Sequence, residues 1–208
     1  MPPPLRLPRG LSTPARIQLF LDDELIYNKE KGGETALSPR LVLAERRAHC
    51  FEGALLAAAA LRRLGHAPLV IQLRAVRDDD HVLALYRERP GAGCWGAVAK
   101  SNYSGLRFRS AVYRSLRELV MSYFDVYFNL EGEKSLRAFG RPVDLSRFDA
   151  RAWETSGESL WDVSLYLATR SFTPILSPGQ PRALTPMDRR LFDAGLVGRV
   201  GFSRDRKR

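Results

Sequence analysis

The sequence predicts an α+β domain in which a buried helix packs on an antiparallel sheet, with additional helices around it. Residues 49–64 are apolar almost all round a helix, which is typical of a fully buried one. Residues 69–100 then contain three short strand-like segments separated by turn residues. With 208 residues and 45% hydrophobic side chains, the chain is long enough to enclose a core of ordinary size.

The N-terminal part is expected to begin with a leader and a helix. Residues 1–13 are rich in proline, which predicts a flexible leader. Thr13 followed by Pro14 has the pattern of a helix N-cap with proline at the first helical position. Apolar residues then recur at helical spacing, so we expect a helix over residues 14–30.

The central segment supplies the predicted sheet. Gly65 is expected to end the buried helix in the left-handed conformation, and Pro68 prevents its continuation. The second strand alternates, with His81, Leu83 and Leu85 on one face. Strands are expected over residues 69–75, 81–87 and 95–100.

The remainder of the chain is predicted to be mainly helical. A wide apolar stripe predicts a core-facing helix over residues 111–129, and further helices are expected over 158–170 and 185–195. We therefore expect a core over residues 14–131, a helical C-terminal extension over 132–200 packed on that core, and a basic tail over 201–208.

Composition narrows the functional classes. The formal charge of +10 favours anionic partners, but the arginines are scattered, so we interpret the excess as a solvated surface and do not expect a nucleic acid partner. A nucleic-acid-associated protein stays as a third hypothesis. No apolar stretch reaches 18 residues, which predicts no membrane span. Two cysteines without paired spacing, and no apolar signal segment, favour a reduced compartment, and we expect the cytoplasm. No phosphate-loop or zinc-site spacing is present, so no cofactor or metal is expected.

Cys50 and His81 are the candidate catalytic pair. Cys50 lies at the first turn of the buried helix, where unpaired N–H groups and the helix dipole favour a thiolate. His81 begins a strand and can take the thiol proton and return it to a leaving group. Asn102 follows the next strand and can orient the imidazole through its amide oxygen. Ser101 and Lys100 are alternatives for this third position.

The other cysteine and the histidine beside Cys50 are assigned structural roles. Cys94 is followed by a strand, and no histidine lies downstream of it, so it is not expected to be a nucleophile. His49 precedes Cys50 directly, and successive helical residues point about 100° apart. We therefore expect His49 to cap the helix or to line the cleft, with a helix-stabilising or packing role favoured over catalysis.

Three segments resemble the transglutaminase-like family of papain-like cysteine enzymes, over about residues 40–105. Ala48-His49-Cys50-Phe51-Glu52-Gly53-Ala54-Leu55, continued by Leu64-Gly65-His66-Ala67-Pro68, resembles its cysteine helix. Asp80-His81-Val82-Leu83-Ala84-Leu85-Tyr86 resembles its histidine strand, and Trp95-Gly96-Ala97-Val98-Ala99-Lys100-Ser101-Asn102 resembles its third strand.

This resemblance implies a transglutaminase-like core and thiol-dependent acyl transfer or amide hydrolysis through a thioester. The catalytic residues would be Cys50, His81 and Asn102, with Asn102 where the family has aspartate. The substrate would be a protein, a peptide or a small amide. The missing aspartate motivates the alternative, a binding or interaction module that keeps the fold without the chemistry.

Overall fold

An antiparallel sheet forms the centre of the fold in the computed structural model, which describes residues 4–200. Its strands are β3 (Leu69–Ala75), β4 (His81–Arg89), β5 (Ala92–Val98), β6 (Arg109–Tyr113), β7 (Leu136–Gly140), β8 (Val143–Asp144) and β9 (Phe172–Pro174). The order across the sheet is β6-β5-β4-β3-β7-β9, and β8 also pairs with β3. Every one of these pairs is antiparallel. The predicted α+β class with an antiparallel sheet is therefore confirmed.

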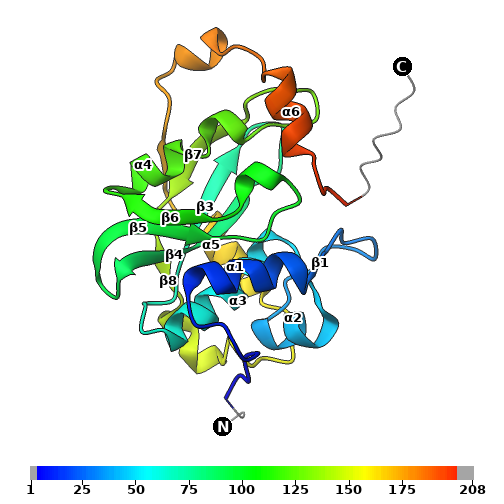
Figure 1. Cartoon of the computed structure of the whole chain (residues 1–208), viewed down its shortest axis with the longest axis vertical. Coiled ribbons are helices and arrows are strands. Elements are labelled where there is room, and N and C mark those ends of the chain that lie inside the picture. The colour runs from blue at the N-terminus through cyan, green and yellow to red at the C-terminus, as the bar shows by residue number, and fades with distance from the viewer. Residues whose placement is uncertain (1–3, 201–208) are drawn as a thin grey trace.

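Helices cover both faces of this sheet. They are α1 (Pro14–Asp23), α2 (Pro39–Glu45), α3 (Cys50–Arg63), α4 (Leu116–Met121), α5 (Trp161–Ala168) and α6 (Arg189–Gly195). Figure 1 shows α1, α2 and α3 on one side of the sheet, with α4 and α6 on the other. Two short strands, β1 (Ile26–Tyr27) and β2 (Arg47–Ala48), form a separate parallel pair. Strand β2 directly precedes α3 in the chain.

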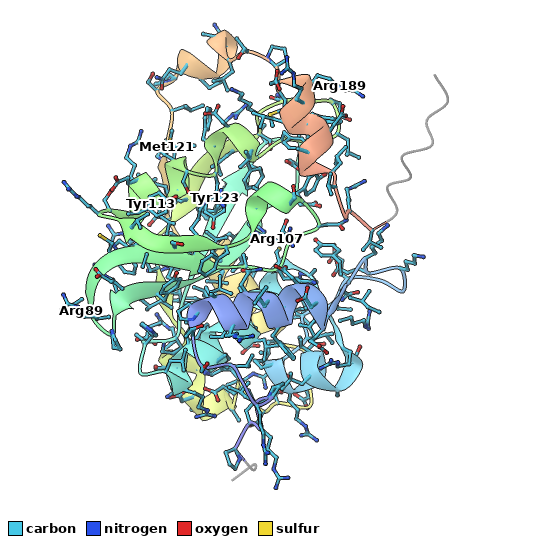
Figure 2. All side chains as sticks on the ribbon, in the orientation of Figure 1. Arg89, Arg107, Tyr113, Met121, Tyr123 and Arg189 are labelled. Atoms are coloured by element: carbon cyan, nitrogen blue, oxygen red, sulfur yellow. The ribbon has the colours of Figure 1, made fainter. Side chains whose placement is uncertain are left out.

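The alternation predicted for β4 is present in the core. Val82, Ala84 and Tyr86 belong to the apolar cluster that contains α3, whereas Leu83 and Leu85 belong to the cluster on the opposite face. That second cluster contains Tyr123, and Figure 2 places the Tyr123 side chain beside α4. The sheet is therefore buried on both faces, so His81 begins a strand that neighbouring layers hold rigidly.

Helix α3 is as buried as the sequence predicted. Every residue from Phe51 to Leu61 is buried, and α3 packs mainly on β4. Gly53 allows α3 to lie close to the segment after β5, because a Cβ at position 53 would lie 2.4 Å from the Cβ of Lys100. The chain thus brings the start of α3 directly against the segment that follows β5.

Four sequence predictions need correction in the N-terminal and central parts. The first helix ends at Asp23 instead of continuing to residue 30, because the chain then turns into β1. The segment at 111–129 is not one helix: β6 pairs with β5, and Ser115 accepts a hydrogen bond from the N–H of Glu118 to begin the short α4. Strand β5 covers Ala92–Val98 instead of residues 95–100. Helix α2 was not predicted, although Ser38 and Pro39 repeat the N-cap and proline pattern.

Both ends of the chain also differ from the expectations. Leu5 is buried in the main core, so the described part of the leader packs on the domain. The segment 132–200 is not simply helical, since it supplies β7, β8 and β9 to the central sheet. The predicted basic tail, residues 201–208, lies outside the described residues. Within residues 4–200, no helix is long and apolar enough to cross a membrane.

Candidate active site

Cys50 is the first residue of α3 and is half-buried. Its helix begins with a capping box: His49 is the N-cap, and Glu52 accepts from the N–H of His49 at 2.9 Å. The Cys50 thiol lies 3.7 Å from the carbonyl oxygen of Asp80, to which it can donate. The helix dipole at this position favours a negatively charged sulfur.

His81 is the first residue of β4, and its side chain is buried with 4% of the residue exposed. Its Nε2 lies 2.8 Å from the carbonyl oxygen of Leu106, so Nε2 carries the proton that it donates there. The ring of Tyr127 packs edge-on against His81, with ring centroids 6.4 Å apart. These contacts fix the tautomer and leave Nδ1 of the neutral ring as an acceptor.

The two neighbouring histidines, His49 and His81, lower the pKa of Cys50. Burial alone raises the pKa of the thiol, but hydrogen bonds from the imidazoles of His49 and His81 outweigh burial and lower it to about 6. A positive charge on either ring acts in the same direction. The lowered pKa favours the thiolate, which is the reactive form of cysteine.

Asn102 does not occupy the position predicted for it. Its amide oxygen accepts a hydrogen bond from the N–H of Val200 at 2.8 Å, while the partner of His81 is the carbonyl of Leu106. The prediction that Asn102 orients the imidazole is therefore wrong in this structure. A backbone carbonyl performs that task, and since every residue has one, the sequence carries no signal for it.

The two alternatives for the third position do not replace Asn102. The ammonium of Lys100 points away from the site and donates to the carbonyls of Leu21 and Leu25 at 2.5 and 2.7 Å. Lys100 thus satisfies carbonyls at the end of α1. Ser101 lines the same pocket as Cys50, but its hydroxyl accepts from the N–H of Tyr103 at 3.0 Å.

The acidic segment before His81, residues 78–80, is hydrogen-bonded to neighbouring parts of the fold. Asp80 accepts from the N–H of Ala75 at 2.9 Å and from the amide of Gln72 at 2.7 Å. The hydroxyl of Tyr127 donates to the carbonyl of Asp79 at 2.7 Å. These bonds tie the loop to β3 and to the opposite layer, and so fix the place where β4 starts.

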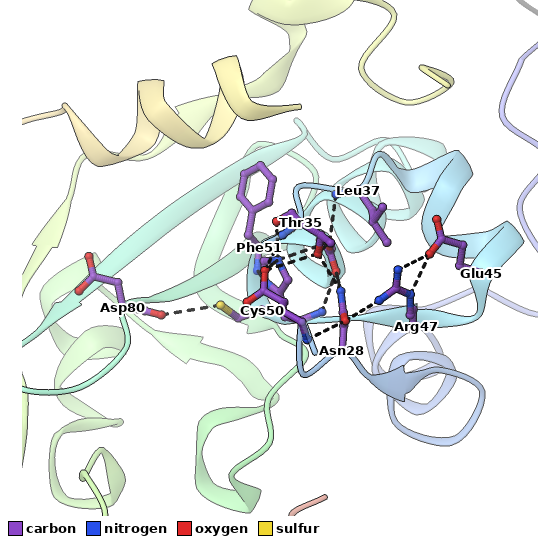
Figure 3. A network of polar contacts seen from close by, with 11 residues as sticks. Asn28, Thr35, Leu37, Glu45, Arg47, Cys50, Phe51 and Asp80 are labelled. Carbon is purple, nitrogen blue, oxygen red and sulfur yellow. Dashed lines mark hydrogen bonds and ion pairs between the residues drawn. The ribbon is translucent and has the colours of Figure 1, made fainter. Parts of the chain in front are cut away.

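His49 both caps α3 and lines the pocket, which are the two positions that the sequence analysis considered for it. Its Nε2 lies 3.0 Å from the carbonyl of Thr35, and its Nδ1 lies 3.3 Å from the N–H of Phe51. Figure 3 shows the polar contacts of this region, which include that of Cys50 with Asp80 and that of Arg47 with Asn28. The expectation of a capping role is confirmed, and His49 also lines the pocket of Cys50. Ser/Thr-x-x-Glu is the usual capping-box pattern, and its histidine variant at 49–52 was the available signal.

These residues line one pocket with a volume of about 290 Å³. The lining residues are Tyr27, Glu30, His49, Cys50, Asp78, Asp79, Asp80, His81, Ser101, Tyr103, Leu106 and Tyr127. Four of them are carboxylic acids, and none is lysine or arginine, although the whole chain has a formal charge of +10. The local charge of the pocket is thus opposite to that of the chain.

The second cysteine, Cys94, lies in β5 and does not line the pocket of Cys50. Within residues 4–200, no group of three or more His, Cys, Asp or Glu side chains is arranged to hold a metal ion.

The fold and the pocket together define an α+β domain with a cysteine–histidine site at the N-terminus of a buried helix. A scan against models of known protein families gives no match, and a search of curated proteins finds no similar sequence.

Proposed function

We propose that this protein is a thiol-dependent acyltransferase or amide hydrolase, with Cys50 as the nucleophile and His81 as the general acid and base. The observation that carries the proposal is geometric: Cys50, at the start of α3, shares a pocket with the buried His81, whose Nε2 is held by the carbonyl of Leu106, and this environment lowers the pKa of the thiol. Structural cysteines in apolar surroundings have raised pKa values, so this environment favours reactivity.

The proposed reaction starts from a Cys50 thiolate whose proton has already passed to Nδ1 of His81. The thiolate attacks an amide or ester carbonyl, and the N–H of Cys50 is available to stabilise the oxyanion. The imidazolium of His81 returns its proton to the leaving group as the bond to carbon breaks, which leaves a thioester. Water or an amine then attacks the thioester with His81 as base, and the Cys50 thiol is released.

The order of elements supports assignment to the transglutaminase-like group of papain-like enzymes. A cysteine begins the buried α3, a histidine begins β4, and β5 lies antiparallel beside β4. The third member of the triad differs from that pattern, since the carbonyl of Leu106 takes the place of a side chain.

The charge of the pocket favours a neutral or cationic substrate. Glu30, Asp78 and Asp79 line it together with Asp80, and anionic groups would be repelled there. This proposal differs from the anionic partners that the formal charge of the whole chain favours.

A binding module without catalysis is the second candidate. It is favoured by the contact of Asn102 with Val200, which leaves the imidazole without a side-chain acceptor. Such a module would need no acyl transfer from Cys50.

Hydrolysis of p-nitrophenyl acetate distinguishes the two candidates. We expect a burst of p-nitrophenol from formation of the Cys50 thioester, lost in Cys50→Ser and kept in Cys94→Ser. A mass increase of one acetyl group on the peptide containing Cys50 would identify the intermediate. If Cys50 is not acetylated, or if both cysteine variants react equally, the enzymatic proposal is wrong and the binding module is supported.

A further inference from the structure

Glu52 is a buried acidic residue that the reaction above does not use. It lies one turn into α3 and is fully buried, with 0% of the residue exposed. Four groups donate hydrogen bonds to its carboxyl oxygens (Figure 3), which are Asn28 Nδ2 at 3.1 Å, Thr35 Oγ1 at 2.6 Å, Leu37 N at 3.0 Å and His49 N at 2.9 Å.

Three of these four groups favour the ionised form of Glu52, because hydrogen bonds from obligate donors stabilise a carboxylate. The N–H groups of Leu37 and His49 can only donate, and the amide of Asn28 presents its NH₂ because its oxygen accepts from Arg47 at 2.8 Å. Only the hydroxyl of Thr35 could accept from a protonated carboxyl. A buried carboxylate is stabilised by a positive partner.

His49 is the titratable group placed to be that partner. Its Nε2 lies 3.4 Å from Oε1 of Glu52, 3.6 Å from Oε1 of Glu30 and 3.0 Å from the carbonyl of Thr35. Three oxygen atoms thus surround one ring nitrogen of a side chain that is only 14% exposed. Such an environment favours the imidazolium over the neutral ring.

The partner of the second ring nitrogen of His49, Nδ1, depends on whether this nitrogen carries a proton. In the neutral ring, Nδ1 accepts from the N–H of Phe51 over a long contact of 3.3 Å. A proton on Nδ1 would end that contact and would be available to the sulfur of Cys50, which lines the same pocket. Burial lowers the pKa of His49, but the hydrogen bond and charge of Cys50, together with the charge of Glu52, raise it to about 9.

We propose that Glu52 is a positioning residue that holds His49 as a permanent imidazolium beside Cys50, so that the thiolate exists before substrate binds. The inference rests on the proposed role of Cys50 as the nucleophile. In this proposal the two histidines have different roles. His49 keeps its proton throughout and supplies a fixed positive charge. His81 carries the proton that moves between the sulfur, the leaving group and water.

The groups facing His49 from each neighbouring element are consistent with this division. Glu52 and Cys50 come from α3, Glu30 comes from the loop after β1, and Arg47 contacts this network through Asn28. The hydroxyl of Tyr27 stays protonated, because burial and the nearby charge of Cys50 raise its pKa. The negative charges adjacent to the imidazole therefore outnumber the positive ones.

The first test measures iodoacetamide alkylation of Cys50 against pH in the wild type, Glu52→Gln, His49→Asn and the double variant, with Cys94 as the reference thiol in the same chain. Asparagine can replace His49 as an N-cap, so it removes the charge and keeps a cap. We expect His49→Asn and Glu52→Gln each to raise the midpoint by about one pH unit or more. The double variant should rise no further than His49→Asn alone, because Glu52 acts through His49.

The second test needs no variant at Glu52, whose loss of charge can impair folding. Chemical shifts of the labelled His49 imidazole are followed against pH in the wild-type protein, with His49→Asn to assign the signal. A midpoint well above the ordinary value of about 6.5 supports the proposal. A midpoint at or below that value overturns it, as does a folded Glu52→Gln that alkylates like the wild type. Failure of the proposed function looks different: Cys50 keeps its low midpoint but is not acetylated by p-nitrophenyl acetate.

Discussion

Replacing His81 by glutamine should change the pH profile of Cys50 alkylation in a way that simple damage to the fold cannot imitate. Glutamine is of similar size and can still donate to the carbonyl of Leu106, but it carries no positive charge. With a pKa of about 6, half of Cys50 is thiolate at pH 6 in the wild type. An opposite charge at short range typically shifts a pKa by about 1–3 units, and we take about 2 for the loss of His81.

Two effects of this change oppose each other. At pH 6 the thiolate fraction falls about 50-fold, but each thiolate becomes about eightfold more nucleophilic, because the Brønsted coefficient is about 0.4–0.5. The variant should therefore alkylate about sixfold more slowly at pH 6 and about sevenfold faster at pH 9. The two profiles must cross between these values.

The assay is iodoacetamide labelling from pH 5 to 9.5, with Cys50 and Cys94 quantified separately by peptide mass spectrometry. His66→Gln is the matched control, since His66 is a half-buried histidine that does not line the pocket. It should keep the wild-type midpoint, and circular dichroism should show that both variants are folded. Profiles that coincide, or that differ by one constant factor at every pH, would refute the role of His81.

Three further predictions concern the surroundings of the site. Asn102→Ala should leave the alkylation midpoint of Cys50 unchanged, because its amide oxygen contacts Val200; a rise of one pH unit would restore Asn102 as the orienting residue. Gly53→Ala should lower the unfolding free energy by about 1–3 kcal/mol in urea titration, since its Cβ would lie 2.4 Å from that of Lys100, and an unchanged free energy would contradict this packing. Burial raises the pKa of Asp78 to about 6, so its ionisation opposes folding: stability should fall as pH rises from about 4 to 6, and Asp78→Asn should add about 1–2 kcal/mol at pH 7. Thermal melts at pH 4 and 7 test this, and an equal effect at both pH values would exclude the titration of Asp78 as the cause.

Local patterns predicted the elements that carry the candidate pair. Helix α3 corresponds to the segment 49–64, which is apolar almost all round a helix and ends before Gly65. Strand β4 corresponds to the alternating segment that begins at His81. These patterns succeed because burial on a helix or a strand is repeated along the chain at a fixed spacing. The sequence did not distinguish the strand β6 and the short α4 from one helix over 111–129, since both bury the same apolar side chains.

The third group of the site could not be obtained in this way. Choosing between Asn102, Ser101 and Lys100 depends on where each side chain points, and that follows from contacts with α1 and with the C-terminal segment at Val200. The role of the Leu106 carbonyl cannot be predicted from a pattern of side chains, because every residue has a backbone carbonyl. Likewise, the four donors to Glu52 come from segments between Asn28 and His49 that only the fold brings together.

The sequence by itself determined that a cysteine begins a buried helix and that a histidine begins a strand after it. Both facts depend on residue types at short spacing, which local periodicity records. Only the tertiary structure decided that Cys50 and His81 share a pocket, that His49 and Glu52 stand behind the sulfur, and that the pocket is acidic in a basic chain. Electrostatic environments are sums over neighbours in space, and those neighbours come from distant parts of the sequence.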